Sequence, residues 1–188
     1  MKLALGSLVL ALLALAPAAS AADTFEVDAS HSVVGFGITH LKVSRFYGRF
    51  NDVSGKIVVD ADPAKCSVEI KVKAASVDTA NGNRDKHLRS QDFFSVEEFP
   101  DITFKSTSVK KTEKGWDVTG TFTLHGVSKE ITVPVEHLGT GQHPRGGTLA
   151  GFEAVFTIKR SDYGMTYGLP DALGDEVKLH IAIEAAKK

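Results

Sequence analysis

The residues able to do acid, base or metal chemistry are scattered along the chain. There are seven histidines: His31, His40, His87, His125, His137, His143 and His180. None stands beside a second ligand at the tight spacing of histidine, cysteine and carboxylate pairs that is typical of zinc sites. No metal site is therefore expected, although residues distant in the sequence can still meet in space.

Ser161 and Asp162 come nearest to a hydrolytic group. A catalytic serine needs a base that a third group orients, and no such partner can be identified. The segment instead predicts a turn, in which Asp162 accepts hydrogen bonds from local amides and Gly164 allows the reversal. A nucleophile elbow and a phosphate-binding loop are both absent. We therefore expect a protein that is not an enzyme and uses no cofactor.

The N-terminus has the order of a secretory signal peptide. Lys2 precedes an apolar run from Leu3 to Leu15, and small residues follow. The run falls short of the roughly 18 to 20 apolar residues that span a bilayer, which argues against a membrane anchor. We predict a signal peptide over residues 1–21, cut after Ala21 or Ala22, and one mature domain over residues 22–188.

Composition excludes some partners. The 22 lysines and arginines nearly balance 23 aspartates and glutamates, so no strong field points to nucleic acid. The lone Cys66 cannot form an internal disulfide. A small strand residue is the expected role for Cys66, with a reactive thiol and an intermolecular bridge as the alternatives.

Period-two alternation of apolar and polar residues dominates the mature chain and predicts strands with one wet face. The expected strands are 33–39, 55–61, 67–74, 102–105, 116–124, 131–137, 149–159 and 177–185. Gly126, between two such runs, predicts an antiparallel hairpin. About eight strands with hardly any helix leave a closed barrel or a two-layer sandwich.

One helix is expected, beginning at a cap on Asn83 and continuing to Gln91. Arg84, Lys86, His87 and Arg89 lie on it, and Phe93 and Phe94 follow it. These side chains are typical either of a basic rim with aromatic walls, suited to an apolar ligand with a polar or anionic head, or of a solvated helix face.

Eleven phenylalanines, all beyond the predicted signal peptide, offer material for an apolar interior. A barrel of about eight strands is either filled by side chains or just wide enough for one small ligand. Small residues within the predicted strands favour the cavity; they are Gly35, Gly37, Gly55, Ala61, Gly120, Gly151 and Ala154.

Longer motifs carry a more specific signal. The helix stretch NRDKHLRSQDFF is followed by EEFPDITFKSTSVKK, and the chain also contains DASHSVVGFGITHLKVSRFYGRF, VTGTFTLHGVSKEITVPV and AGFEAVFTIKRSDYG. In these stretches, which span essentially the whole mature chain, the sequence closely resembles the YceI-like family of exported lipid-binding proteins. The positions that match the family pattern are His31, Phe36, His40, Gly48, Phe50, His87, Leu88, Arg89, Phe93, Phe94, Phe104, Gly126 and Arg160.

The resemblance implies an all-β fold: an eight-stranded antiparallel, lipocalin-like barrel with a short helix near the mouth of a long apolar tunnel. It implies a periplasmic, non-catalytic carrier of a long apolar lipid, with a polyisoprenoid or an isoprenoid quinone as the expected ligand. The predicted ligand-binding residues are Phe36, Ile38, Phe50, Arg84, His87, Leu88, Arg89, Phe93, Phe94, Phe104, Phe122, Phe156 and Arg160.

Two other functions stay open at this point. One is an enzyme acting on such a lipid through His87, Arg89 or Asp162, and the other is a filled barrel that serves as a ligand-free stress-protection module. A transient contact with inner-membrane proteins is a further expectation. The oligomeric state is open, with a dimer among the options.

Overall fold

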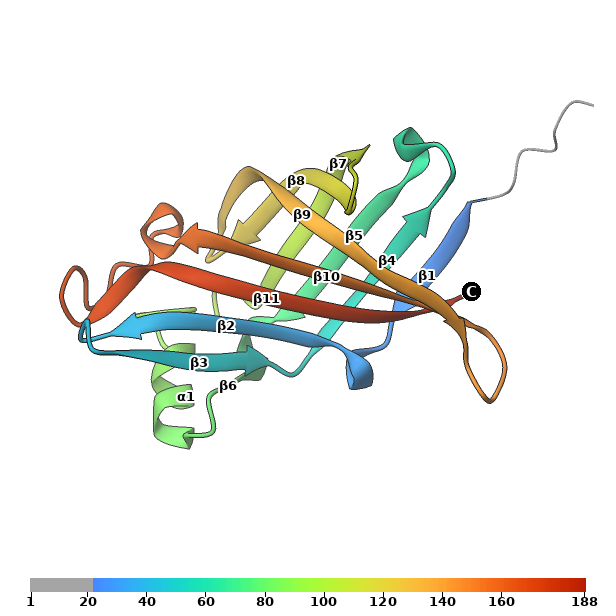
Figure 1. The fold of residues 1–188 in the computed structure, drawn as a ribbon. Helices are drawn as coiled ribbons and strands as arrows, with labels where there is room; N and C mark the ends of the chain where they lie inside the picture. The colour runs from blue at the N-terminus through green and yellow to red at the C-terminus, as the bar shows by residue number, and fades with distance from the viewer. Residues whose placement is uncertain (1–21) are drawn as a thin grey trace, which may run out of the picture.

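A computed structural model describes residues 22–188 of the protein (Figure 1). The predicted signal peptide, residues 1–21, lies outside the described residues. The strands are β1 (Asp23–Val27), β2 (Val33–His40), β3 (Ser44–Phe50), β4 (Val53–Val59), β5 (Ser67–Lys73), β6 (Val77–Asp78), β7 (Asp101–Lys111), β8 (Gly115–Leu124), β9 (Val127–Gln142), β10 (Thr148–Lys159) and β11 (Leu173–Lys187). The helices are α1 (Gly82–Arg89) and four short 3-10 turns, η1 (Ala29–His31), η2 (Pro63–Lys65), η3 (Ala74–Ser76) and η4 (Arg160–Tyr163).

Eight strands form a closed antiparallel ring in the order β1-β4-β5-β7-β8-β9-β10-β11. The ring closes where β1 pairs with the end of β11, with Phe25 opposite Lys187 and Val27 opposite Ala185. Closure leaves no free edge around this ring. The predicted eight-stranded barrel is confirmed, and the sandwich alternative is wrong.

One edge of β11 serves two strands in succession. After β1 has paired with its last residues, the chain turns through η1, and β2 pairs with the rest of that edge from Ala182 to Leu173. β3 then returns antiparallel to β2 and meets the short β6. The β2–β3 hairpin therefore runs toward the end of the barrel beside which α1 lies (Figure 1).

The predicted hairpin after Leu124 is confirmed as the β8–β9 connection. His125 and Gly126 both have positive φ, 51° and 73°, as a two-residue type I′ turn requires. Glycine is also needed at the second position for space, since a Cβ on Gly126 would lie 2.4 Å from Cε1 of Phe99.

Two strands were not among those predicted: β1, which belongs to the closed ring, and β3, which forms the hairpin with β2. In β3 the inward positions include Ser44 and Gly48, which weaken the apolar alternation, and β1 is only five residues long. Each of the eight predicted runs corresponds to a strand. The run 33–39, however, forms β2 outside the closed ring, and the eighth strand of the ring is β1.

The predicted cap of α1 is wrong. Asn81, not Asn83, is the N-cap, and its side chain accepts a hydrogen bond from the amide of Arg84 at 3.1 Å. Asn81 has the extended backbone that a cap needs, and Asn83 already lies in the first turn. The helix ends at Arg89, two residues before the predicted Gln91.

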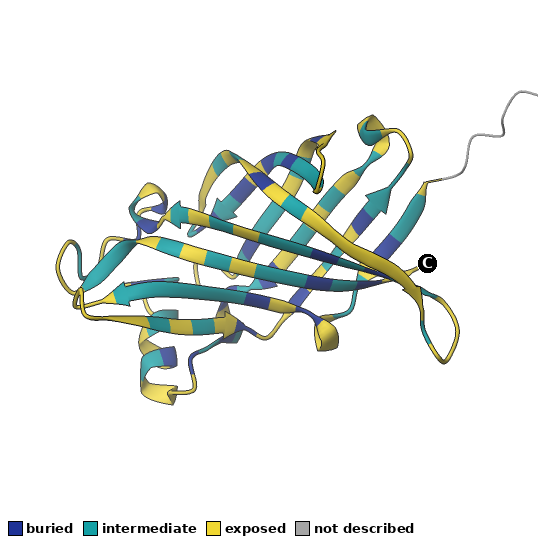
Figure 2. Ribbon diagram, viewed as in Figure 1, coloured by how far each residue is buried: buried dark blue, intermediate teal, exposed yellow. Residues whose placement is uncertain are grey.

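Burial alternates along the strands, as Figure 2 shows for β10 and β11. One group of buried side chains, which includes Phe25, Phe152, Ile183 and Ala185, lies where β1, β10 and β11 meet. Among residues 22–188, no helix combines the length and the apolar character needed to cross a membrane.

Elsewhere in the barrel, the inward side chains surround a cavity.

Candidate functional site

The barrel encloses a cavity of about 640 Å³. This volume lies within the ~300–1,000 Å³ that is typical of small-molecule sites. Its walls are mostly valine, isoleucine, leucine and phenylalanine side chains from the inward positions of the strands. On β11 the lining runs from Leu173 to Ile183, which is roughly 33 Å of strand at 3.3 Å per residue. The cavity is therefore long and apolar, and we call it the tunnel.

The tunnel reaches solvent at one end. The exposed residues of its lining are His40, Ser44, His87, Tyr167 and Ala172. They come from the β2–β3 hairpin, from α1 and from the loop before β11, which lie together at the left of Figure 1. This end is the mouth, and the expected helix near the mouth is present there.

The other end of the tunnel is lined by apolar side chains together with Cys66, which is half-buried. The Cys66 sulfur accepts a hydrogen bond from the amide of Asp60 at 3.3 Å. The thiol is thus part of the turn between β4 and β5 as well as of the lining. Trp116, the only tryptophan of the chain, lines the tunnel from the strand β8.

Glycines contribute to the tunnel in a way that the sequence argument did not anticipate. Of the small strand residues that favoured a cavity, only Ala154 is part of the lining. Gly120 instead lets the ring of Phe104 lie against the wall, since a Cβ there would be 2.8 Å from Cζ of Phe104. Gly48 does the same for Phe36, whose Cζ would be 2.4 Å from the added atom. Because these two glycines have no side chain, the rings of Phe104 and Phe36 can lie close to the barrel wall and leave the lumen open.

Arg84 brings a positive charge to the mouth. Its guanidinium lies 3.8 Å from the ring centre of Phe46, a cation–π distance. Nε donates to Oγ1 of Thr79 at 2.8 Å and Nη2 to the Thr79 carbonyl at 2.6 Å. Arg84 is therefore held in place by stacking and by hydrogen bonds rather than by an ion pair.

The other two basic side chains of the predicted rim, Lys86 and Arg89, do not line the tunnel. Arg89 donates from Nε to the carbonyl of Ala75 at 2.7 Å and from Nη2 to that of Val77 at 2.9 Å. It fastens α1 to the segment before it. Lys86 is exposed, so the basic rim is narrower than predicted.

His87 joins the helix to the loop across the mouth. Its ring packs edge-on against Phe93 and Tyr167, with centroid distances of 5.0 and 5.1 Å. Nε2 lies 2.7 Å from the carboxylate of Asp92. The aromatic cluster therefore forms one side of the entrance.

Arg160 is a buried cation in the tunnel wall, only 3% exposed. It donates hydrogen bonds to the Met165 carbonyl in the loop before β11 at 2.8 Å, and to the carbonyls of Gly174 and Leu173 at the start of β11 at 2.8 and 3.2 Å. Burial lowers the pKa of the guanidinium, and the charge of Asp175 opposes that shift. Arg160 thus shapes the mouth by ordering this loop.

The turn around Ser161 differs from the prediction. Asp175, not Asp162, accepts from the Ser161 amide at 2.9 Å and from its hydroxyl at 2.8 Å. Burial works against the charge of Asp175, but the bonds from Ser161 and the nearby Arg160 lower its pKa on balance. Asp162 pairs with Lys129 at 3.3 Å, while Gly164 supplies the predicted reversal with a φ of 75°.

The tunnel brings together twelve of the thirteen predicted ligand-binding residues; the exception is Arg89. Whether they contact a ligand stays a prediction. Ser44 and Tyr167 were not among the predicted site residues, and His40 was named only as a position that matches the family pattern. Their polar or exposed character gave no periodic signal, and they reach the mouth through the packing of a hairpin against a distant loop.

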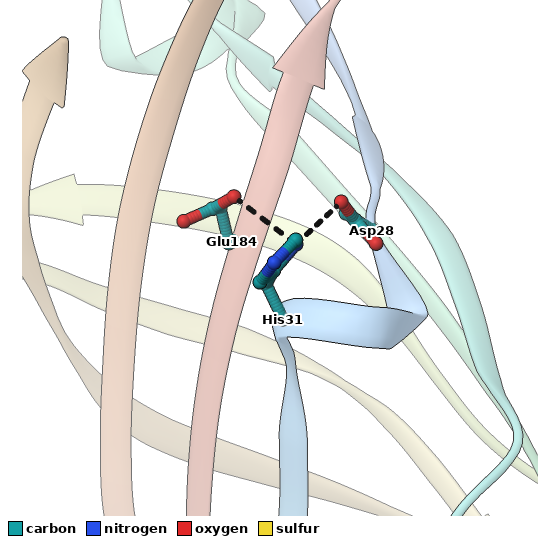
Figure 3. A group of neighbouring side chains, drawn as sticks. All are labelled: Asp28, His31 and Glu184. Atoms are coloured by element: carbon teal, nitrogen blue, oxygen red, sulfur yellow. Dashed lines mark hydrogen bonds and ion pairs between the residues drawn. The ribbon is translucent and has the colours of Figure 1, made fainter. Parts of the chain in front are cut away.

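A separate polar group lies on the outside of the barrel (Figure 3). His31 on η1 points between Asp28 and Glu184 of β11, with Nδ1 2.9 Å from the first carboxylate and 3.6 Å from the second. Such a set could ligate a divalent cation, which the scattered histidines had not led us to expect. Hydrogen bonds from Ser30 and then His31 lower the pKa of Asp28, and both carboxylates raise the pKa of His31. The group ties η1 to β11.

Comparisons with known proteins identify the family from the sequence and match the fold to solved structures. The model of the YceI-like domain matches residues 25–185. "Protein YceI" of Salmonella newport is 40% identical over 191 residues, which cover all of both chains. The crystal structure of Burkholderia cenocepacia BcnA superposes with a TM-score of 0.75 at 24% identity, over 84% of this chain and 98% of that one. A polyisoprenoid-binding domain from Saccharophagus degradans, implicated in plant cell wall breakdown, has a TM-score of 0.68 at 17% identity, over 87% and 98%.

Proposed function

The chain belongs to the YceI-like family, and on that premise we propose that it is a non-catalytic, periplasmic carrier of a long apolar lipid, with a polyisoprenoid or isoprenoid quinone as its ligand. The observation that carries the proposal is the long apolar tunnel with its polar mouth at one end. A lipid tail fits the walls, and a more polar head can remain beside His40, Arg84 and His87.

The energetics favour a long ligand. A tail that loses about 400 Å² of apolar surface to the tunnel gains roughly 10 kcal/mol at about 25 cal/mol per Å². Association itself costs about 4 to 15 kcal/mol. A short apolar molecule gains too little to offset this cost, whereas a chain that fills the tunnel offsets it over the lower half of the range.

The lining gives little support to catalysis. Within residues 22–188, no serine or thiol of the lining is hydrogen-bonded to a histidine, so no activated nucleophile faces the tunnel. Arg89 and Asp162, two of the three residues considered for an enzyme, are engaged elsewhere. The Saccharophagus relative, named for polyisoprenoid binding, supports the ligand class. The predicted signal peptide supports the periplasmic location.

Native mass spectrometry of the full chain, expressed in cells and purified without detergent, tests the proposal. We expect a bound isoprenoid lipid that is recovered chemically unchanged. Leu179→Trp places a large side chain in the lumen from the inward face of β11, and this variant should lose the lipid. Lys178→Trp, one residue away and exposed, is the matched control and should keep it.

A protein that is always free of lipid and takes up no added quinone or polyprenyl phosphate would refute the carrier function. Conversion of the bound lipid to a product would refute the non-catalytic part alone.

A further inference from the structure

The β2–β3 hairpin ends in an exposed apolar tip beside the tunnel mouth. The tip consists of Leu41, Lys42 and Val43, and its two apolar side chains are 54% and 83% exposed. His40 and Ser44, which close the hairpin as a cross-strand pair, both line the tunnel. The tip therefore projects directly from the rim of the mouth.

The tip is held rigidly rather than left as a loose loop. The Leu41 amide donates to the carbonyl of Ala172 at 2.9 Å, and Nζ of Lys42 lies 2.7 Å from the carboxylate of Asp171. Both contacts fasten it to the loop that carries Tyr167, another rim side chain that is 48% exposed. The three apolar groups thus belong to two joined segments, the β2–β3 turn and the loop before β11, which lie at the left of Figure 1.

The turn also has an unusual backbone for its residues. Leu41 and Lys42 have φ of 50° and 60°, in the left-handed region. Asn or Gly adopts this region at lower cost than a leucine does. A turn that served only to connect two strands would not need an apolar side chain held out into solvent at this position.

We propose that the tip docks on the surface of an anionic phospholipid bilayer, so that the tunnel mouth opens against the membrane. The inference rests on the proposed function, because an isoprenoid lipid resides in a bilayer until a carrier extracts it. Docking shortens the path on which the tail meets water.

Size and charge favour a bilayer over a protein partner. A stable protein interface takes about 20 to 30 residues a side, many more than the tip and Tyr167 supply. Binding at a bilayer surface scales instead with the apolar area that inserts and with the attraction of anionic lipids. Within the described residues, Arg45 beside the tip and Arg84 at the mouth make no ion pair with a carboxylate, and Asp171 is already paired with Lys42. The other carboxylates of the mouth are also engaged, Asp92 with His87 and Asp85 with Thr79, so Arg45 and Arg84 are the basic groups that anionic headgroups can approach.

Co-sedimentation with vesicles of equal parts phosphatidylethanolamine and phosphatidylglycerol tests the proposal. The double variant Leu41→Asn with Val43→Ser removes the apolar tip, and Asn suits the left-handed turn, so folding should be kept. We expect vesicle binding to weaken about tenfold. The control, Leu138→Ser with Val155→Ser, removes similar side chains, 58% and 40% exposed, away from the mouth. It should bind as the unaltered protein does.

Uptake of a quinone separates docking from the tunnel itself. In the tip variant, uptake from vesicles should slow about tenfold, while uptake from detergent solution should be unchanged. Equal losses by both routes would mean that the tunnel was damaged and would overturn the docking proposal, as would vesicle binding equal to that of the unaltered protein. A dimer in solution that the tip variant disperses, without vesicle binding, would assign the tip to a second copy instead. If the unaltered protein docks but takes up no lipid by either route, the carrier function fails and docking stands.

Discussion

Phe104→Asp tests whether the tunnel wall excludes water. Phe104 lies in β7 between Ile70 and Phe122 on the neighbouring strands and lines the tunnel. Burial of a carboxyl without a cationic partner favours its neutral form and raises its pKa. At pH 7 the folded protein must then hold a proton that an unfolded Asp, with a pKa of about 3.9, has released.

The cost of that proton follows from the pH difference. About three pH units at 1.36 kcal/mol each is roughly 4 kcal/mol. Loss of the ring of Phe104, which is partly buried, adds to this a part of the ~3 to 5 kcal/mol that a fully buried phenylalanine contributes. Together these take up much of the ~5–15 kcal/mol by which a domain is stable. The control Phe104→Asn has a side chain of the same size as Asp that does not titrate. The difference in stability between the Asp and Asn variants therefore isolates the cost of the bound proton.

Because the pKa of the introduced carboxyl is raised in the folded state, the Phe104→Asp variant should lose stability as the pH rises. Below about pH 4 the carboxyl is neutral in both states, and the Asp and Asn variants should be similarly stable. As the pH rises toward 7 the Asp variant should lose roughly 4 kcal/mol relative to Asn. Urea unfolding between these pH values, followed by the fluorescence of Trp116, measures the difference. Parallel stability of the two variants over the whole range would show that the carboxylate is hydrated, and the reasoning about an apolar inward face would be wrong.

Three further changes test other features. Gly48→Ala should push the ring of Phe36 into the lumen, lower the free energy of unfolding by about 1 to 3 kcal/mol and weaken quinone uptake, whereas Gly151→Ala, with only ordinary contacts at its Cβ, should do neither. Because the pKa of His31 is raised in the folded state, its contribution is complete below about pH 6.5 and lost as the pH rises through the raised value; the stability difference from His31→Gln should therefore shrink between pH 5 and pH 9 in urea titrations, and a constant difference would contradict the pairing. Arg160→Met loses three bonds to carbonyls but relieves a buried charge, so we expect a net loss of about 2 to 4 kcal/mol and faster hydrogen exchange in the loop before β11; unchanged exchange would mean that this loop orders itself.

Local patterns predicted much of the barrel. Alternation along 67–74 and 177–185 assigned an inward face, and residues of that face such as Ile70 and Leu179 do line the tunnel. The β8–β9 turn was also predictable, because Gly126 tolerates a positive φ between two alternating runs. These features depend on neighbouring residues, so the sequence alone contains their cause.

Small residues showed the limit of such patterns. Glycine within a strand indicates that something approaches closely, but not from which side. Gly120 faces the ring of Phe104 and thins the tunnel wall, whereas Gly37 lies against the exposed ring of Tyr47 outside the barrel. Glycine within a strand therefore indicates a cavity correctly at Gly120 but not at Gly37.

By itself the sequence determined about eight alternating strands and the set of apolar side chains that face inward, because strand periodicity assigns each residue to a face. The pairing of β1 with β11, which only the tertiary structure shows, decided that these strands close as a barrel and do not form a sandwich. The tertiary structure alone decided which charges meet the tunnel. Arg84 reaches the mouth, while Arg89, five residues later on the same helix, is taken up by backbone carbonyls. It also brought His40 and Tyr167 to one rim, since hydrogen bonds between a hairpin and a loop some 130 residues away hold them there. Such contacts join segments distant in the chain, and no local pattern encodes them.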